Sequence, residues 1–388
     1  MSVPRTEVPA DFGFTDDHAL LRQEARRFLG ERLPMAELRK LADAGVGFDR
    51  ALWKDLAQLG WAGLVLPEAV GGAGLGWLHL ELLLEEMGRR LVPGPFLGSL
   101  LAGIAIERAG SDAQRARLLP GIAAGDVVAT AATHEPNGSF EAADVGATAE
   151  PVDGGWVLRG LKTHVLCGAD AGLVVAPFRE PSGAVALFAV ELPAAGVATA
   201  SEVSVDPTRP TARVAFDGVR VGADARLAGD GAAAWRAMLV RGFAALAAES
   251  VGGAESVLLA TRDYAVARKQ FDRQIGFFQA VKFPIVDMMI GIELARSLAV
   301  GAAAALDQAA GPPDHPPAGA EILARMAKAH ASDVFSTAVR KGVQLHGGYG
   351  FTWDCDVHFY FRRALWSRAM LGDAIHHRRA LAELLFAD

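Results

Sequence analysis

Cysteine is almost absent from this chain of 388 residues, since Cys167 and Cys355 are the only two and stand far apart. Such a pair builds neither a disulfide framework nor a cysteine-based metal motif, so we expect no metal site. Aromatic residues make up only 7% of the chain, but hydrophobic residues reach 51%. At this length the chain can bury a large core, and two or three domains are expected.

Long basic runs and long apolar runs are also missing. The formal net charge is -7 and no run of lysine and arginine exceeds a few residues, which argues against nucleic acid or an anionic membrane surface as a partner. Residues 1–7 lack the apolar core of a signal peptide, and no stretch reaches the ~20 uninterrupted apolar residues of a membrane span. We expect a cytoplasmic protein without membrane insertion.

The hydrophobic periodicity divides the chain into three regions. Helical spacing runs from about residue 16 to 125, short strands separated by turn signals follow to about 229, and helical spacing returns from 232. We predict an N-terminal helical domain (1–126), a central β-barrel or sandwich domain (127–230) and a C-terminal helix bundle (231–388). The fold class is therefore α+β.

Particular elements can be assigned within the two later regions. An Asp-Gly pair predicts a hairpin over residues 152–158, and further strands are expected at 173–176, 186–192 and 212–221. Long helices are expected at 235–270, 280–308 and 318–345. The Pro-rich run 311–317 cannot be helical and separates the last two.

Two segments of the C-terminal region suggest a ligand site. Residues 268–279 read Arg-Lys-Gln-Phe-Asp-Arg-Gln-Ile-Gly-Phe-Phe-Gln at the expected end of a long helix, and residues 343–351 read Val-Gln-Leu-His-Gly-Gly-Tyr-Gly-Phe. An arginine fork suits a pyrophosphate, and Gly347 and Gly348 allow close backbone approach to a ligand. Taken singly, the first segment also fits a solvated helix end and the second a C-cap turn.

Together, in this order and spacing, the two segments resemble the acyl-CoA dehydrogenase flavoprotein family. The likeness extends to Phe14-Thr-Asp-Asp-His, to residues 66–75 and to His134-Glu-Pro, and so covers nearly the whole chain. The C-terminal Gly-Asp followed by His-Arg is similar to the ending of a bacterial subgroup. The resemblance implies FAD as cofactor, an acyl-CoA or acyl-carrier thioester as substrate, and electron-transfer flavoprotein or a similar acceptor as partner.

The resemblance also implies which residues contact the flavin. Arg268 matches the arginine that meets the pyrophosphate across a subunit interface. The other matching contacts are Gln270, Phe271, Ile275, Phe278, Gln279, Gln344 and Gly348. Because each flavin would need two chains, an obligate dimer or tetramer is implied, formed with itself or with a different family subunit.

The flavin-ring side departs from the family pattern. Where relatives carry Thr-Glu-Pro, this chain has His134-Glu-Pro with Thr133 one residue earlier, and the usual Trp-Ile-Thr strand appears as His164-Val-Leu. Thr133 or His134 is the candidate to replace the missing hydroxyls. A histidine that only satisfies local backbone is an equal explanation for His134.

The catalytic base is absent from both positions at which the family places its glutamate. These positions align with Leu371 and Gly242, and neither residue is a carboxylate. Proton abstraction from the α-carbon of a thioester needs a positioned base whose pKa is raised by burial. The sequence therefore offers only substitutes for this role.

Asp373 and Glu249 are the two substitute bases. Asp373 lies two residues beyond the aligned position, but it also fits as the N-cap of the last helix. Glu249 lies about 10 Å along the helix from Gly242, and pairing with an arginine such as Arg262 is an alternative role. His376 and His377 are more remote candidates.

Three functions remain open from the sequence. The first is FAD-dependent α,β-dehydrogenation of an acyl thioester, with Asp373 as the favoured base. The second is a non-catalytic partner subunit of a heteromeric dehydrogenase, such as those acting on steroid side chains, which the two unoccupied base positions favour. The third is a flavin oxidase or hydroxylase relative, which no residue specifically supports.

Overall fold

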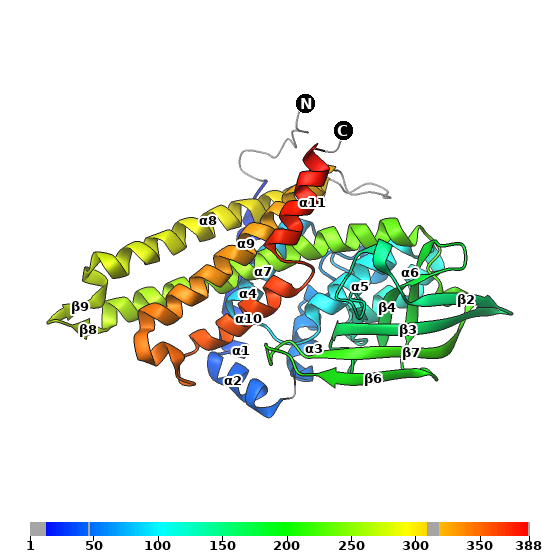
Figure 1. The fold of residues 1–388 in the computed structure, drawn as a ribbon, viewed down its shortest axis with the longest axis horizontal. Coiled ribbons are helices and arrows are strands. Elements are labelled where there is room, and N and C mark those ends of the chain that lie inside the picture. Colours follow the sequence, from blue (N-terminus) through cyan, green and yellow to red (C-terminus); the bar gives the residue numbers. More distant parts are fainter. Residues whose placement is uncertain (1–12, 46, 309–317, 387–388) are drawn as a thin grey trace.

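The structure, a computed structural model, describes residues 13–45, 47–308 and 318–386. Helices, a sheet and a second set of helices follow one another along the chain, with the sheet at the right of the molecule in Figure 1 and the long helices extending to the left. The predicted α+β architecture of two helical regions around a central β region is confirmed. The predicted boundaries at 126/127 and 230/231 fall between helix and strand and directly before a helix.

The N-terminal region is helical. Asp49 caps one helix by accepting a hydrogen bond from the Ala51 amide at 2.8 Å, and Ser111 caps another by accepting from the Gln114 amide at 3.2 Å. Its helices are α1 (Asp16–Arg32), α2 (Met35–Ala44), α3 (Arg50–Gln58), α4 (Trp77–Arg89), α5 (Phe96–Ala109) and α6 (Asp112–Ala123), with 3-10 turns η1 (Trp61–Gly63) and η2 (Glu68–Val70). Helix α5 is buried on nearly all sides, so it forms the centre of this region.

One sheet of seven strands forms the central region. Its order is β1-β4-β2-β3-β7-β6, with β5 paired to β4. The predicted hairpin is confirmed: β2 and β3 pair antiparallel around Asp153-Gly154, and Gly154 has a φ of 77°. The strands are β1 (Ala129–Ala131), β2 (Thr148–Val152), β3 (Gly155–Leu166), β4 (Leu173–Arg179), β5 (Val185–Glu191), β6 (Val197–Glu202) and β7 (Thr211–Gly222), with turns η3 (Ala142–Asp144) and η4 (Ala223–Ala225).

The C-terminal region is a bundle around one long helix. Its helices are α7 (Gly231–Ala267), α8 (Gln279–Gln308), α9 (Ala318–His346), α10 (Val357–Ala369) and α11 (Ala374–Phe386), with turns η5 (Ile275–Phe277) and η6 (Gly347–Phe351). Helices α4 and α7 cross at glycines: a Cβ at Gly252 would lie 1.8 Å from the Glu85 carbonyl oxygen, and one at Gly88 2.0 Å from that of Glu249. Only glycine permits this approach, which joins the N-terminal helices to the bundle.

The end of α7 differs from the predicted helix over residues 235–270. The helix stops at Ala267, and β8 (Lys269–Gln270) pairs with β9 (Arg273–Gln274) in a tight hairpin. Phe271 and Asp272, at its tip, have φ values of 53° and 59°. Two consecutive left-handed residues cannot continue a right-handed helix, so the prediction is wrong beyond Ala267. The predicted non-helical run 311–317 lies outside the described residues.

Two described helices, α7 and α8, are long and apolar enough to cross a membrane by length and composition alone. The most apolar window of α7 is 78% buried within the fold and that of α8 is 56% buried. Both pack against α9 in the bundle. Their apolar character is therefore that of core helices, although α8 keeps one apolar face exposed.

Candidate active site

A cavity of about 360 Å³ lies between the sheet and α10. Its walls come from the segment after β1, from β3, from the loop between β6 and β7, and from α10. The lining residues are His134, Gly138, His164, Val203, Ser204, Val205, Thr211, Leu365, Trp366, Ala369 and Met370. The structure thus brings together His134 and His164, the two segments that the resemblance places at the flavin ring. We refer to this space as the ring cavity.

His134 is the buried polar group of the ring cavity. Its Nδ1 lies 2.8 Å from the Thr133 hydroxyl, and its backbone carbonyl accepts from the Thr163 amide at 2.9 Å. Burial, helped by the neighbouring His164, lowers the pKa of His134 to about 4. The imidazole is therefore neutral near pH 7. Thr133 is itself buried and does not line the cavity; it orients His134.

The two family base positions meet at one point in space, beside α5. A Cβ built on Gly242 of α7 would lie 2.7 Å from Leu371 Cδ1 and 3.2 Å from Leu101 Cδ2. Leu371 is fully buried, and its φ of 56° is uncommon for a leucine. Both positions are therefore filled by apolar packing. Leu101, from α5, could not be foreseen because it is distant in sequence from both.

The loop that carries Leu371 is held by buried polar groups. Lys328 of α9 donates to the Ser367 carbonyl at 2.8 Å, to the Gly372 carbonyl at 3.0 Å and to a serine hydroxyl. His377 Nε2 lies 2.9 Å from the Leu371 carbonyl, and burial lowers the pKa of His377 to about 2. His377 is thus a neutral structural group at this loop.

Asp373 lies directly before α11 and caps it. Its Oδ1 accepts from the Ile375 amide at 3.0 Å and from the His376 amide at 2.9 Å. The hydrogen bond from the His376 amide is the largest cause that lowers the pKa of Asp373. This arrangement matches the capping alternative, and a carboxylate with a lowered pKa is a poorer base for an α-proton.

Glu249 is buried in an ion pair away from the ring cavity. Its Oε1 accepts from Arg209 Nη2 at 2.5 Å, and its side chain does not line the cavity. The sequence suggested Arg262 as a partner, but Arg262 pairs with Asp263. Arg209 was missed because it belongs to a loop of the central region, 40 residues away in sequence.

Phe140 stands between the ring cavity and a second cavity of about 360 Å³ at the start of α7. Its ring centroid lies 5.7 Å from that of His134, which lines the ring cavity, and 6.4 Å from that of Phe243, which lines the second. On a third side it contacts His376 at 5.1 Å. Phe140 is buried, so an aromatic side chain fills the space between the two cavities.

The residues matched to the nucleotide end of FAD lie elsewhere. Arg268, Gln270 and Phe271 are exposed on the β8–β9 hairpin, at the left end of the molecule in Figure 1 and opposite the sheet. Gln344 and Gly348 are exposed at the end of α9. The remaining members of this set are Ile275, Phe278 and Gln279, which follow the hairpin.

A ring stack joins these two segments. Tyr264 of α7, four residues before Arg268, stacks on His346 with centroids 4.5 Å apart and on Tyr349 at 6.1 Å. The structure therefore brings the Arg268 and Gln344–Gly348 segments to one end of the bundle. It does not bring them to the ring cavity of the same chain.

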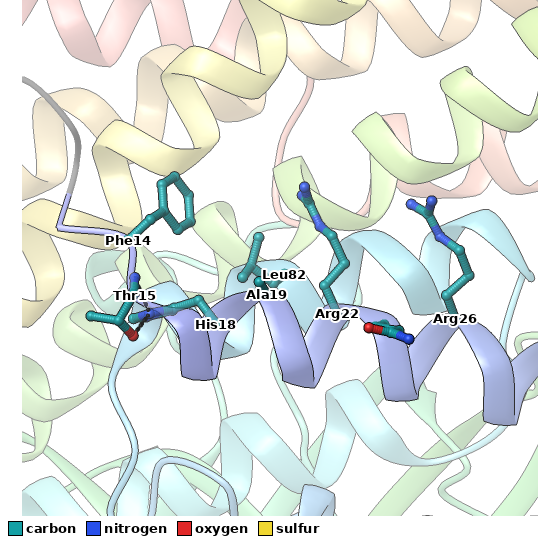
Figure 2. A pocket seen from close by; sticks show the side chains of 8 residues that line it. Phe14, Thr15, His18, Ala19, Arg22, Arg26 and Leu82 are labelled. Carbon is teal, nitrogen blue, oxygen red and sulfur yellow. Dashed lines mark hydrogen bonds between the residues drawn. The ribbon is translucent and has the colours of Figure 1, made fainter.

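A further cavity, of about 390 Å³, lies along α1 and contains none of the predicted site residues. Figure 2 shows Arg22 and Arg26 projecting from one side of α1 near this cavity. Arg22 pairs with Glu85 at 3.1 Å and Arg26 with Glu86 at 2.6 Å, both on α4. Their charge is already compensated within the protein. Across the described ranges, no group of three or more potential metal ligands was found.

Comparison with known proteins defines the class. Residues 15–126 match the family model of the acyl-CoA dehydrogenase N-terminal domain, and residues 229–386 match that of the C-terminal domain. The chain belongs to the acyl-CoA dehydrogenase family, as the sequence resemblance predicted. Its members are flavin-dependent oxidoreductases that act on acyl-CoA thioesters.

Three similar proteins illustrate the relationship. Acyl-CoA dehydrogenase IpdE2 of Mycobacterium tuberculosis is 31% identical over 92% of this chain and 93% of its own length. The ChsE4–ChsE5 complex from Mycobacterium tuberculosis aligns with a TM-score of 0.88 and 27% identity, over 97% of this chain and all of that one. The Tcur3481–Tcur3483 steroid dehydrogenase aligns with a TM-score of 0.84 and 31% identity, over 95% of this chain and 97% of that one.

Proposed function

We propose that this chain is an FAD-binding subunit of an acyl-CoA dehydrogenase whose α-proton-abstracting carboxylate is supplied by another chain. The observation that carries the proposal is the apolar contact of Leu371 with Gly242 and Leu101, which fills both family positions for the base. The expected reaction is α,β-dehydrogenation of an acyl-CoA thioester. Bound FAD would supply the acceptor for the hydride that leaves the β-carbon.

The ring cavity suits a flat aromatic ring system. Trp366 and Met370 line it from α10, and His134 and His164 line it from the sheet side. His134 offers a neutral imidazole, while the valines of the 203–205 loop offer apolar surface. These residues would hold the isoalloxazine ring in this proposal.

The nucleotide end of the same flavin would be held by a second chain. Arg268 and its neighbours lie at the opposite end of the molecule from the ring cavity (Figure 1), so one chain cannot provide both ends. A guanidinium at position 268 suits the pyrophosphate through paired, charge-assisted hydrogen bonds. We propose that each flavin is shared between two family chains, and that electron-transfer flavoprotein or a similar carrier accepts the electrons.

The alternative of a self-sufficient enzyme with its own substitute base has less support. Asp373 is engaged by two backbone amides, and Glu249 by Arg209. Phe140 also lies between the ring cavity and the second cavity, where it obstructs a path for a thioester. The two-component names of the ChsE4–ChsE5 and Tcur3481–Tcur3483 relatives support a heteromeric assembly.

The visible spectrum of the purified protein tests the proposal. We expect the chain alone to be colourless, or to hold a flavin that no acyl-CoA reduces, and the chain co-expressed with its partner to hold a flavin that a suitable acyl-CoA bleaches. Bleaching of the chain alone would show a complete active site and would overturn the subunit proposal.

Arg268→Ala tests the shared flavin. We expect the variant to lose FAD from the assembled protein, because the pyrophosphate loses its guanidinium partner. Arg262→Ala is the matched control, since Arg262 lies on the same helix and pairs with Asp263. Flavin content is measured by absorbance after gel filtration. Full retention of FAD by Arg268→Ala would contradict the assignment.

A further inference from the structure

Four charged side chains are buried directly behind the ring cavity. Asp206 and Arg209 belong to the loop between β6 and β7, Glu249 to α7 and Arg363 to α10, and none is more than 3% exposed. Arg363 pairs with Asp206, and Arg209 pairs with Glu249 at 2.5 Å. This set, the junction cluster, connects the central region to two C-terminal helices.

The junction cluster fixes the loop that forms one wall of the cavity. Asp206 Oδ1 accepts from the Thr208 amide at 2.9 Å and from its hydroxyl at 2.6 Å. Arg363 Nη2 donates to the Thr208 hydroxyl at 2.7 Å and to the Leu91 carbonyl at 3.2 Å. The residues that line the cavity, 203–205 and Thr211, flank this pinned segment on both sides.

The same cluster supports the opposite wall. The Arg209 guanidinium carbon lies 5.1 Å from the centroid of the Trp366 ring, and Trp366 lines the cavity three residues after Arg363. Glu249 holds Arg209 in this place through its ion pair. A cation against an indole face is attractive, so the pair fixes the plane of Trp366.

Buried ion pairs of this kind contribute little net stability, because the cost of removing the charges from water offsets their attraction. Their geometry is nevertheless strict, since each charge must meet its partner. A cluster placed only for stability would not need to connect both walls of a cavity.

We infer that Asp206, Arg209, Glu249 and Arg363 are positioning residues that set the separation and orientation of the two walls of the ring cavity for the flavin ring. The inference rests on the proposed function. Glu249 acts through Arg209 and Trp366 and does not touch the reacting atoms. The carboxylate that sequence analysis offered as a base thus has a role in holding the cofactor.

Glu249→Gln tests the inference, because glutamine keeps the shape of the side chain and removes its charge. The FAD dissociation constant is measured in whichever form of the protein holds FAD, the chain alone or the chain with its partner. We expect it to rise about tenfold, together with a changed visible circular dichroism of the bound flavin. Glu180→Gln, which removes the charge from the Arg226–Glu180 pair elsewhere in the central region, should change neither.

Separate measurements distinguish positioning from stability. If Glu249→Gln lowers the thermal midpoint but leaves the dissociation constant and the flavin spectrum unchanged, the inference is overturned. If the single variant does not fold, Arg209→Gln with Glu249→Gln removes both charges and leaves none unpaired. Weaker FAD binding by the folded double variant supports the inference, and unchanged binding overturns it. A wild-type protein that takes up no FAD in either form overturns the proposed function itself, and the inference with it.

Discussion

Asp373 is the residue at which capping and catalysis predict opposite results. Asparagine caps a helix about as well as aspartate, so Asp373→Asn should preserve both stability and turnover of the flavin-loaded assembly. Asp373→Ala should lower the unfolding free energy by about 1 kcal/mol, because the amides of residues 375 and 376 lose their acceptor. Denaturant unfolding and acyl-CoA bleaching measure the two effects. Loss of bleaching with retained flavin in Asp373→Asn would identify Asp373 as the base.

At the same scale, what the sequence could reveal about the site depends on distance along the chain. Local alignment located Leu371 and Gly242 and showed that neither is a carboxylate. It also offered the cap at Asp373, which depends only on the next three residues. Leu101 and Phe140 were missed because they reach the base positions and the cavity from α5 and from the segment after β1. No local pattern marks such contacts.

Within α4, Glu81 makes stability depend on pH. It is buried, and neither carboxylate oxygen has a hydrogen-bond partner among the described residues. Burial, helped by the nearby Glu85, raises the pKa of Glu81 to about 8. Since this exceeds the unfolded value of about 4.5, the folded state keeps its proton longer. The resulting stabilisation is complete below about pH 4.5 and is lost as the pH rises through 8.

Glu81→Gln should remove this dependence, because an amide of the same shape cannot ionise. We expect the thermal midpoint of the wild type to fall more steeply than that of the variant as the pH rises toward 8 and beyond. Calorimetry across this range measures the difference. Glu37→Gln, in an exposed pair with Lys40, is the control and should follow the wild type. Parallel curves for Glu81→Gln and the wild type would show that Glu81 is not the responsible group.

Periodicity predicted most of the elements because each helix or strand carries its own apolar spacing. The Asp153-Gly154 hairpin was predictable from residue type, since glycine favours the left-handed conformation that the turn requires. The end of α7 was not, because Phe271 and Asp272 adopt that conformation without a glycine. Tertiary packing of the β8–β9 hairpin overrides local preference there.

For the whole molecule, the distribution of flavin contacts implies an assembly. The ring cavity and the Arg268 hairpin lie at opposite ends of the chain (Figure 1), so a complete site requires a second chain. The exposed apolar face of α8 is the surface we propose for it. Phe283, Val286, Ile290 and Leu294 are each about half exposed and recur at spacings of three and four residues. Apolar stripes of this kind mark protein interfaces.

Replacing two residues of this stripe tests the assembly. Ile290→Glu with Leu294→Glu should dissociate the protein, because two carboxylates would be buried without partners in the interface. FAD should be lost at the same time, because each flavin is shared between chains. Sedimentation velocity and flavin absorbance measure the two effects on one sample. Leu59→Glu, a comparably exposed leucine after α3, is the control and should leave both unchanged. An intact assembly that has lost its flavin would place the interface elsewhere, and dissociated chains that keep their flavin would show that one chain suffices to bind it.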